Sequence, residues 1–306
     1  MTGFGELDLV ERFYRTWDKL LTTEFLILIT YVIFCSVAVA VFLQLSRSGS
    51  YRFRIRATIS GLTQMRRELA RSIFSLTIFQ IAMVASRVVA MGFGVFIDLQ
   101  DPQPFWKIAP CFVLIFIAHD TYFYWTHRLM HLSGVYRLVH REHHRSVAPT
   151  AYAAYSFAFV EAWVQGSFLV FYALLFPINT TLVVFFLFVE IIYNATIHSG
   201  IDPFPRWMVT HRIFGWVAGS AYHDLHHRTV DCNFGLYFRF WDRLIGTEHP
   251  DFVRIHNYIH SPNNDGNAYK LLKRHRRIPE LELETSKLAA KTETRTNSRP
   301  LNAAFG

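Results

Sequence analysis

The sequence predicts an all-α integral membrane protein, a bundle of about four to five transmembrane helices with a cytoplasmic helical cap that carries histidine motifs. Two observations predict this class. The 306-residue chain is 52% hydrophobic, its mean hydropathy is +0.19, and polar segments separate long uncharged ones. The net charge of +8 comes from basic residues beside these apolar segments, which favours a membrane surface, and not nucleic acid, as the partner.

The N-terminal part of the chain supplies the first expected span. Residues 1–24 carry charges of both signs and are expected to form an amphipathic lead-in. Residues 25–43 are uncharged and close to the ~20 residues that cross a bilayer as a helix. Residues 46–72 hold seven arginines against a single acid, Glu68, so the positive-inside rule places this segment in the cytoplasm.

Further apolar segments are expected to cross or enter the membrane. Residues 73–97 form a second span, interrupted by Arg87, and residues 105–125 return after the turn DLQDPQP. Residues 157–198 are mostly apolar around a break at Pro177-Ile178-Asn179, and their length fits a hairpin of two spans. With this topology, every histidine motif lies on the cytoplasmic side.

The histidines are the chemical signal in this sequence. Residues three and four apart on a helix share a face, so an HxxxH motif and two HxxHH motifs each present imidazoles to one side. The first motif is His127 and His131, the second is His140, His143 and His144, and the third is His223, His226 and His227. Eight or nine imidazoles exceed the usual coordination number of one ion and predict two. The motifs contain no cysteine, which argues against a zinc finger or an iron–sulfur cluster.

These motifs and their surroundings resemble a known family. The segments HDTYFYWTHRLMH, HREHH, NATIHSG and YHDLHH, followed by NFG and FWDRLIGT, are similar to the fatty acid hydroxylase / sterol desaturase superfamily over about residues 116–251. That superfamily consists of membrane-bound non-haem di-iron oxygenases. The resemblance implies nine metal ligands in this chain: His127, His131, His140, His143, His144, His198, His223, His226 and His227.

Neighbouring acids are candidates for orienting the ligand imidazoles. Asp120 lines up with His127 on a helix, and Glu142 and Asp224 lie inside the two HxxHH motifs. His119 lies about 80° off the face of His127 and is the weaker candidate ligand. The remaining histidines, which lack a matching partner spacing, are expected to be surface or structural residues: His211, His249, His256, His260 and His275.

The resemblance also implies a domain organisation and an activity. Residues 25–262 would form the membrane-embedded catalytic domain, with short cap helices from residue 199, and residues 263–306 a basic turn and a disordered tail. Two iron ions and dioxygen would hydroxylate an unactivated C–H bond of a fatty-acyl or sterol-like lipid. Electrons would come from a separate b-type cytochrome or ferredoxin with its reductase, because the chain shows no haem or flavin motif.

Two alternatives remain open at this point. A lipid desaturase would use the same metal site, and a metal-binding or metal-transport protein without redox chemistry would need only the imidazoles. Transport would require polar residues along the spans, where the sequence has only Arg87, Glu161 and Glu190. The host membrane would be the endoplasmic reticulum in a eukaryote or the inner membrane in a bacterium.

Overall fold

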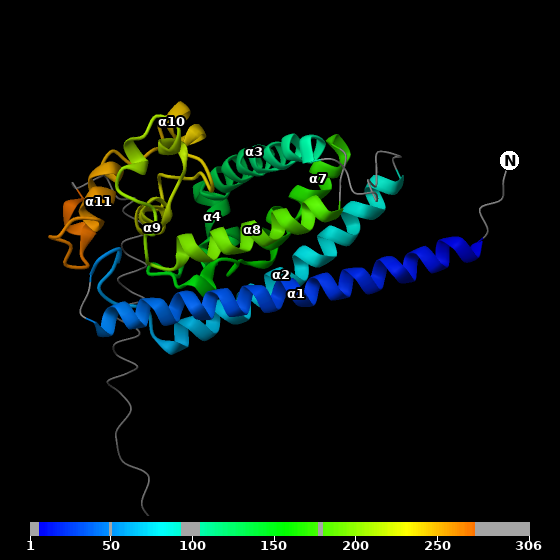
Figure 1. The fold of residues 1–306 in the computed structure, drawn as a ribbon, viewed down its shortest axis with the longest axis horizontal. Coiled ribbons are helices and arrows are strands. Elements are labelled where there is room, and N and C mark those ends of the chain that lie inside the picture. Colours follow the sequence, from blue (N-terminus) through cyan, green and yellow to red (C-terminus); the bar gives the residue numbers. More distant parts are fainter. Residues whose placement is uncertain (1–5, 49–50, 93–104, 177–179, 273–306) are drawn as a thin grey trace, which may run out of the picture. The chain divides into compact units, whose positions relative to one another are not determined.

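The computed structural model describes residues 6–48, 51–92, 105–176 and 180–272. Within these ranges all regular elements are helices, as predicted, and extended backbone pairs only in three isolated bridges. The long helices run side by side in a bundle, and the short helices that follow residue 199 gather at the end where α1 finishes (Figure 1). The α-helices are α1 (Glu6–Arg47), α2 (Leu62–Gly92), α3 (Phe105–Met130), α4 (Ser133–Val139), α5 (Arg141–His144), α6 (Phe159–Gly166), α7 (Phe168–Leu175), α8 (Thr180–His198), α9 (Ser220–Thr229), α10 (Phe240–Ile245) and α11 (Phe252–Ile259).

Helix α1 carries the clearest membrane signal. It is continuous through both the expected lead-in and the expected first span, so the backbone shows no boundary at residue 24. Its part from Phe25 to Arg47 is long and apolar enough to cross a membrane, and no other helix in the described ranges meets that criterion. Phe25, Ile33 and Val37 are each more than half exposed there, as side chains facing lipid would be.

The other expected spans differ in detail from the prediction. Helix α2 begins at Leu62, well before residue 73, and α3 continues past residue 125. The first arm of the hairpin is two short helices, α6 and α7, which meet at Ser167. The Ser167 hydroxyl donates to the Trp163 carbonyl (2.7 Å), a contact that bends helices. The turn DLQDPQP and the break at residues 177–179 lie outside the described residues.

The core of the bundle forms where small residues let helices approach closely. Helix α2 packs along α6 and α7, and α1 packs along α8. Gly166 lies against Phe79 and Ala82 of α2, where a Cβ atom would come within 3.0 Å of the Phe79 ring. Tyr31 of α1 is fully buried and donates its hydroxyl to the Tyr152 carbonyl (2.7 Å). The Gly166 contact holds α6 closely against α2.

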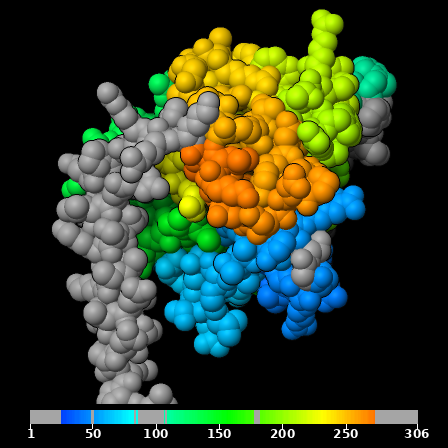
Figure 2. All heavy atoms as spheres, turned by 90° about the vertical axis from the view of Figure 1, so that its left-hand side faces the viewer, coloured from blue at the N-terminus to red at the C-terminus, as the bar shows by residue number. Residues whose placement is uncertain are grey.

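The basic segment between α1 and α2 is partly buried and is therefore more than a solvated loop. Arg54 and Arg56 are buried. Arg56 donates to the Pro149 carbonyl (2.7 Å) and pairs with Asp224 of α9 (3.0 Å). Figure 2 shows this face, with the surface of α11 and the residues after it (orange) directly against the segment after α1 (blue). The side chain of Asn264 supports this contact by donating to the carbonyls of Tyr51 and Arg54.

Candidate metal centre

The nine predicted histidines meet in one place although they come from four parts of the chain. His127 lies in the last turn of α3, and the His131 amide donates to the His127 carbonyl (3.2 Å), so the helical turn continues to His131. His140 lies between α4 and α5, and His143 and His144 belong to α5. His198 is the last residue of α8. The final three histidines lie on α9.

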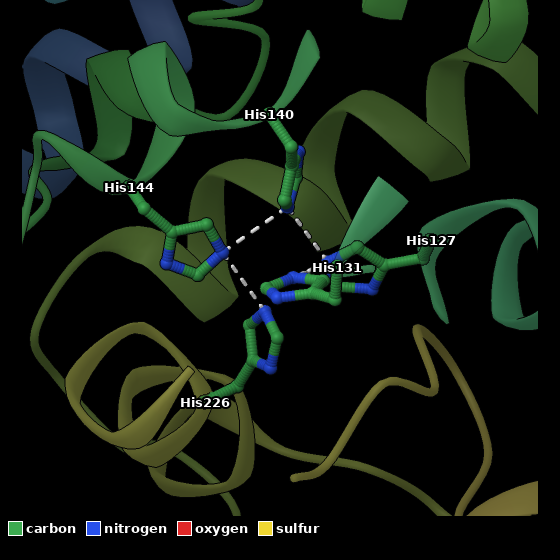
Figure 3. A group of neighbouring side chains, drawn as sticks. All are labelled: His127, His131, His140, His144 and His226. Carbon is green, nitrogen blue, oxygen red and sulfur yellow. Dashed lines mark hydrogen bonds between the residues drawn. The ribbon is translucent and has the colours of Figure 1, made fainter. Parts of the chain in front are cut away.

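The imidazoles form two groups, in each of which the potential ligand atoms all lie within 4.8 Å of one another. The five-histidine group, drawn in Figure 3, contains His127, His131, His140, His144 and His226. The four-histidine group contains His143, His198, His223 and His227. The two groups adjoin, because the ring centroids of His144 and His227 lie 4.7 Å apart.

Each HxxHH motif is divided between the two groups. In the second motif the i, i+4 pair His140 and His144 stays together, and His143 joins the other group. In the third motif, on α9, His223 and His227 stay together, and His226 joins the five-histidine group. Adjacent helical residues diverge by about 100°, so a neighbouring HH pair can reach two centres at once. The motif is therefore a bridge between two potential ion sites and does not form one site by itself.

The proton positions in the five-histidine group favour a cation between the rings. His127 Nδ1 lies 2.9 Å from the Phe234 carbonyl, and His140 Nδ1 lies 2.6 Å from Glu161 Oε1. Both partners accept, so each Nδ1 carries the proton and each Nε2 of a neutral ring carries a lone pair. Yet the two Nε2 atoms face one another at 3.0 Å. Two lone pairs at that distance repel unless a cation lies between them.

The Nε2 atoms of the four-histidine group also converge, although only one of these rings has its tautomer fixed by a hydrogen bond. His198 Nδ1 lies 2.8 Å from the Asn194 carbonyl, which fixes its proton on Nδ1. Its Nε2 atom faces Nε2 of His223 at 3.0 Å and Nε2 of His227 at 3.3 Å. In both groups the donor atoms therefore converge as they do around a bound ion, and imidazole nitrogen suits iron, zinc, copper and nickel.

Burial keeps these rings neutral. Eight of the nine imidazoles are buried and His131 is half-buried. Burial lowers the pKa of His144, His226 and His227 well below the usual value for histidine, and the neighbouring imidazoles lower it further. Neutral imidazole is the form that binds a metal, so no proton has to leave at neutral pH.

A tight turn after α9 completes the site. Helix α9 is followed by Val230, whose left-handed backbone (φ 72°) is rare for a β-branched residue. The chain then reverses, so that the Cys232 carbonyl accepts from His226 Nδ1 at 2.6 Å. Two residues later, Phe234 supplies the carbonyl that accepts from His127. One short loop thus orients rings from two helices.

Of the three acids proposed to orient ligand imidazoles, none makes a hydrogen bond to an imidazole in the described structure. Glu142 pairs with Arg145 at 2.9 Å on the surface, and Asp224 pairs with Arg56. Asp120 accepts from the backbone amides of Tyr237 (2.7 Å) and Phe238 (3.1 Å). Asp120 therefore affects His127 only indirectly, because it holds the loop whose Phe234 carbonyl orients that ring.

Two positioning acids were missed from the sequence. Glu161 of α6 is buried against His140, and Asp242 of α10 accepts from the amides of Phe234 (2.9 Å) and Gly235 (2.7 Å). Glu161 had a signal, since an isolated acid in an apolar segment usually has a functional partner. Asp242 had none beyond its place in the segment FWDRLIGT.

The remaining six histidines lie outside the two groups. His119 belongs to neither group; its Nδ1 lies 3.0 Å from the Tyr237 hydroxyl. His211 is exposed, His249 is buried, and His275 lies outside the described residues. The prediction that His256 and His260 lack a partner spacing was wrong: they are an i, i+4 pair, and both lie beside Asp202.

A cavity of about 50 Å³ lies inside the bundle next to this centre. Its walls are mostly apolar side chains of α1, α2, α7 and α8, and its polar lining residues are Gln80, His119, Tyr155, Gln165 and Glu190. Helix α6 connects the cavity to the metal centre, because Glu161 contacts His140 and Gln165, one turn later, lines the cavity. The Phe157 ring, shortly before α6, packs against His143 of the metal centre with a centroid distance of 5.2 Å.

Comparison with known proteins agrees with the geometry. The model of the fatty acid hydroxylase family matches residues 112–247, the part of the chain that holds all nine histidines. No solved structure gives a significant match to this chain.

Several curated relatives are sterol enzymes. A Delta(7)-sterol 5(6)-desaturase of Gibberella zeae is 28% identical over 68% of this chain and 64% of its own length. Human lathosterol oxidase is 27% identical over 60% of this chain and 61% of its own length. A methylsterol monooxygenase of Aspergillus fumigatus is 32% identical over 50% of this chain and 54% of its own length. The chain therefore matches less than two thirds of each relative.

Proposed function

Because the chain belongs, through residues 112–247, to the fatty acid hydroxylase and sterol desaturase superfamily, we propose that it is a membrane-bound, dioxygen-dependent oxidoreductase that hydroxylates an unactivated C–H bond of a lipid. The observation that carries the proposal is the convergence of imidazole nitrogens in both histidine groups, above all the proton-free Nε2 atoms of His127 and His140, which face each other at 3.0 Å. Hydrogen bonding alone does not explain that arrangement. A pair of metal ions does.

The nine histidines would hold two irons, one in each group. When bound, the irons supply the redox chemistry with dioxygen, using electrons from a separate b-type cytochrome or ferredoxin with its reductase. The protein's own part is orientation: the Phe234, Cys232 and Asn194 carbonyls set the tautomers, and Glu161 does so for His140. Glu161 also places a carboxylate beside a ligand shell that is otherwise neutral.

The substrate would be an apolar lipid that reaches the centre from within the bundle. The sterol enzymes among the relatives favour a sterol-like lipid over a fatty-acyl one. The mostly apolar lining of the cavity in the bundle suits such a molecule. Gln165 and Glu190, which line this cavity, would be available to bind a hydroxyl group of the substrate.

The membrane placement supports this route. The exposed apolar surface of α1 from Phe25 to Arg47 would lie in lipid, and the other apolar helices would complete a bundle of four to five membrane segments. The arginine-rich segment after α1 would place the metal centre on the cytoplasmic side. The membrane would be the endoplasmic reticulum in a eukaryotic cell or the inner membrane in a bacterial one.

Desaturation is the second candidate, because two of the relatives described above carry names of that chemistry or of a sterol oxidase. The two reactions differ in the fate of oxygen. Cells expressing the chain would be grown under ¹⁸O₂, and their lipids compared by mass spectrometry with those of cells expressing the His226→Ala variant. A product that carries one ¹⁸O atom supports hydroxylation, whereas a product lighter by two hydrogens supports desaturation. Lipid profiles that do not differ would contradict both.

A further inference from the structure

A second cluster of potential ligands lies apart from the nine histidines. Asp202, in the segment after α8, meets His256 of α11 and His260, which directly follows that helix. Their potential ligand atoms all lie within 4.8 Å of one another. We infer that these three side chains bind a third metal ion, a divalent cation of the zinc type.

The distances in this cluster are longer than those of a hydrogen-bonded pair and are close to those between two ligands of one metal ion. Asp202 Oδ2 lies 3.5 Å from His256 Nε2 and 3.8 Å from His260 Nε2. A hydrogen-bonded imidazole and carboxylate close to roughly 2.7–2.9 Å. His140 and Glu161 do close in this way, to 2.6 Å. Around a tetrahedral zinc ion with bonds of ~2.0–2.1 Å, by contrast, neighbouring ligand atoms stand about 3.4 Å apart.

The three atoms that face one another in this cluster, Asp202 Oδ2 and the Nε2 atoms of His256 and His260, are not engaged elsewhere. The side chains of Asp202, His256 and His260 are only 0%, 1% and 4% exposed. Asp202 Oδ2 and both Nε2 atoms are buried without a hydrogen-bond partner among the described residues. The other carboxylate oxygen, Oδ1, accepts from the Phe204 amide (3.1 Å), which orients Oδ2 toward the two rings. A buried carboxylate oxygen without a partner is costly, and a cation removes that cost.

The buried guanidinium of Arg239 is occupied by other partners. Burial lowers the pKa of His256, the Asp202 carboxylate opposes this shift, and Arg239, which is fully buried, makes a smaller contribution to the lowering. Its guanidinium is engaged by Glu248 (2.6 Å) and by the Gly215 carbonyl (2.8 Å). The donor set itself, two imidazoles and one carboxylate, is one that zinc accepts while keeping a fourth position for water.

The ion would join three segments of the chain. The Asp202 amide donates to the Phe53 carbonyl (2.8 Å), and the Phe53 ring packs on His260 at 5.3 Å. Phe53 adopts a left-handed backbone (φ 64°), which a bulky residue keeps only when its surroundings hold it. Asp202 follows His198 by one turn's length of chain, so the third ion would brace the end of α8 that delivers His198 to the metal centre.

Counting ions in the purified, full-length protein tests the inference. The protein in detergent is stripped with a chelator, equilibrated with zinc alone and freed of excess, and zinc per chain is measured by mass spectrometry. His256→Asn and His260→Asn are each expected to hold one ion fewer than the wild type, and His211→Asn, a control on an exposed histidine, the same number. Equal zinc in the wild type and both cluster variants would overturn the inference. The result is a difference, so it is readable whatever number of ions the nine histidines hold.

A ligand-retaining variant covers the case in which the asparagine variants do not fold. His260→Cys keeps a metal-binding side chain, and a thiolate bound to Co²⁺ absorbs strongly in the near ultraviolet. The cobalt-loaded His260→Cys protein is expected to show this band, which wild type and His211→Cys lack. A cobalt-loaded His260→Cys protein without the band would overturn the third site, whereas the proposed lipid chemistry would stand, since it rests on the other nine histidines.

Discussion

The two histidine groups share their ligand chemistry but differ in how firmly their rings are held. In the five-histidine group, three rings donate Nδ1–H to an oxygen: His127, His140 and His226. In the four-histidine group only His198 has a clear Nδ1 contact of this kind, while Nδ1 of His223 and of His227 finds no partner in the described part of the chain. The groups also differ in access, because half-buried His131 belongs to the first and all four rings of the second are buried.

The difference teaches that metal retention and metal access need not coincide. Partners that fix the tautomer of a ligand imidazole raise its basicity and are each worth about 10- to 100-fold in metal affinity. The five-histidine group therefore should bind its ion more tightly at equilibrium, although its half-buried ring exposes it more. The four-histidine group should be the weaker but more enclosed site.

The largest effect is expected from removing one ligand from either group. His226→Ala and His143→Ala should each lower turnover by more than ~100-fold, beyond the loss of any supporting contact, and should lower the metal content. The variants would be compared by lipid product and by iron per chain, with His211→Ala as the control. Full activity in either variant would sink the assignment of that group.

The next effect concerns the support of a single ligand. Glu161→Gln keeps the shape of the side chain but weakens the contact to His140, and should lower iron affinity and turnover by about 10- to 100-fold. Glu142→Gln, which alters a surface acid of the second motif, should leave both unchanged. If the two variants behave alike, Glu161 does not set the orientation of His140.

Chelation compares the two groups directly. When iron is withdrawn at equilibrium with increasing chelator, the first ion lost should come from the four-histidine group, at about 10-fold lower chelator than the second. The His143→Ala protein should then lack the early step and the His226→Ala protein the late one. Loss of both ions in one step would show that the anchoring contacts make no difference to retention.

A smaller effect is expected where an acid acts through a loop. Asp120→Ala removes the acceptor for the Tyr237 and Phe238 amides and should cost about 1–3 kcal/mol of stability through unpaired backbone donors. Asp120→Asn keeps an oxygen in place and should lose less. Thermal unfolding of both variants measures the difference. Equal losses would indicate that the charge of Asp120, and not its acceptor oxygen, stabilises the loop.

The sequence predicted the helical class and the set of histidines, because both depend on local periodicity. It could not predict the division of the HxxHH motifs, since spacing tells which residues share a helix face but not which neighbour that face meets. The alignment of Asp120 with His127 was sound as helical geometry. Its carboxylate nevertheless contacts residues 237–238, a contact that is remote in sequence and carries no local signal.

The same limit explains the partners that were missed. Arg56 was counted as one charge of a basic segment, yet it is buried against Asp224 of α9. His256 and His260 had the right spacing, but their third partner, Asp202, is far away in the sequence and stands alone there. Glu161 could have been singled out by its charge in an apolar segment, although nothing local indicated His140 as its partner.

The backbone of Val230 shows what the turn after α9 demands. Helices commonly stop at a glycine in this conformation, whereas a side chain there costs roughly 1–2 kcal/mol. A valine keeps this conformation only while the surrounding packing holds it there. The loop that orients the His226 and His127 rings is therefore held under backbone strain. When that packing loosens, this turn should be among the first parts to change conformation. The rings of His226 and His127 would then lose their fixed orientation together.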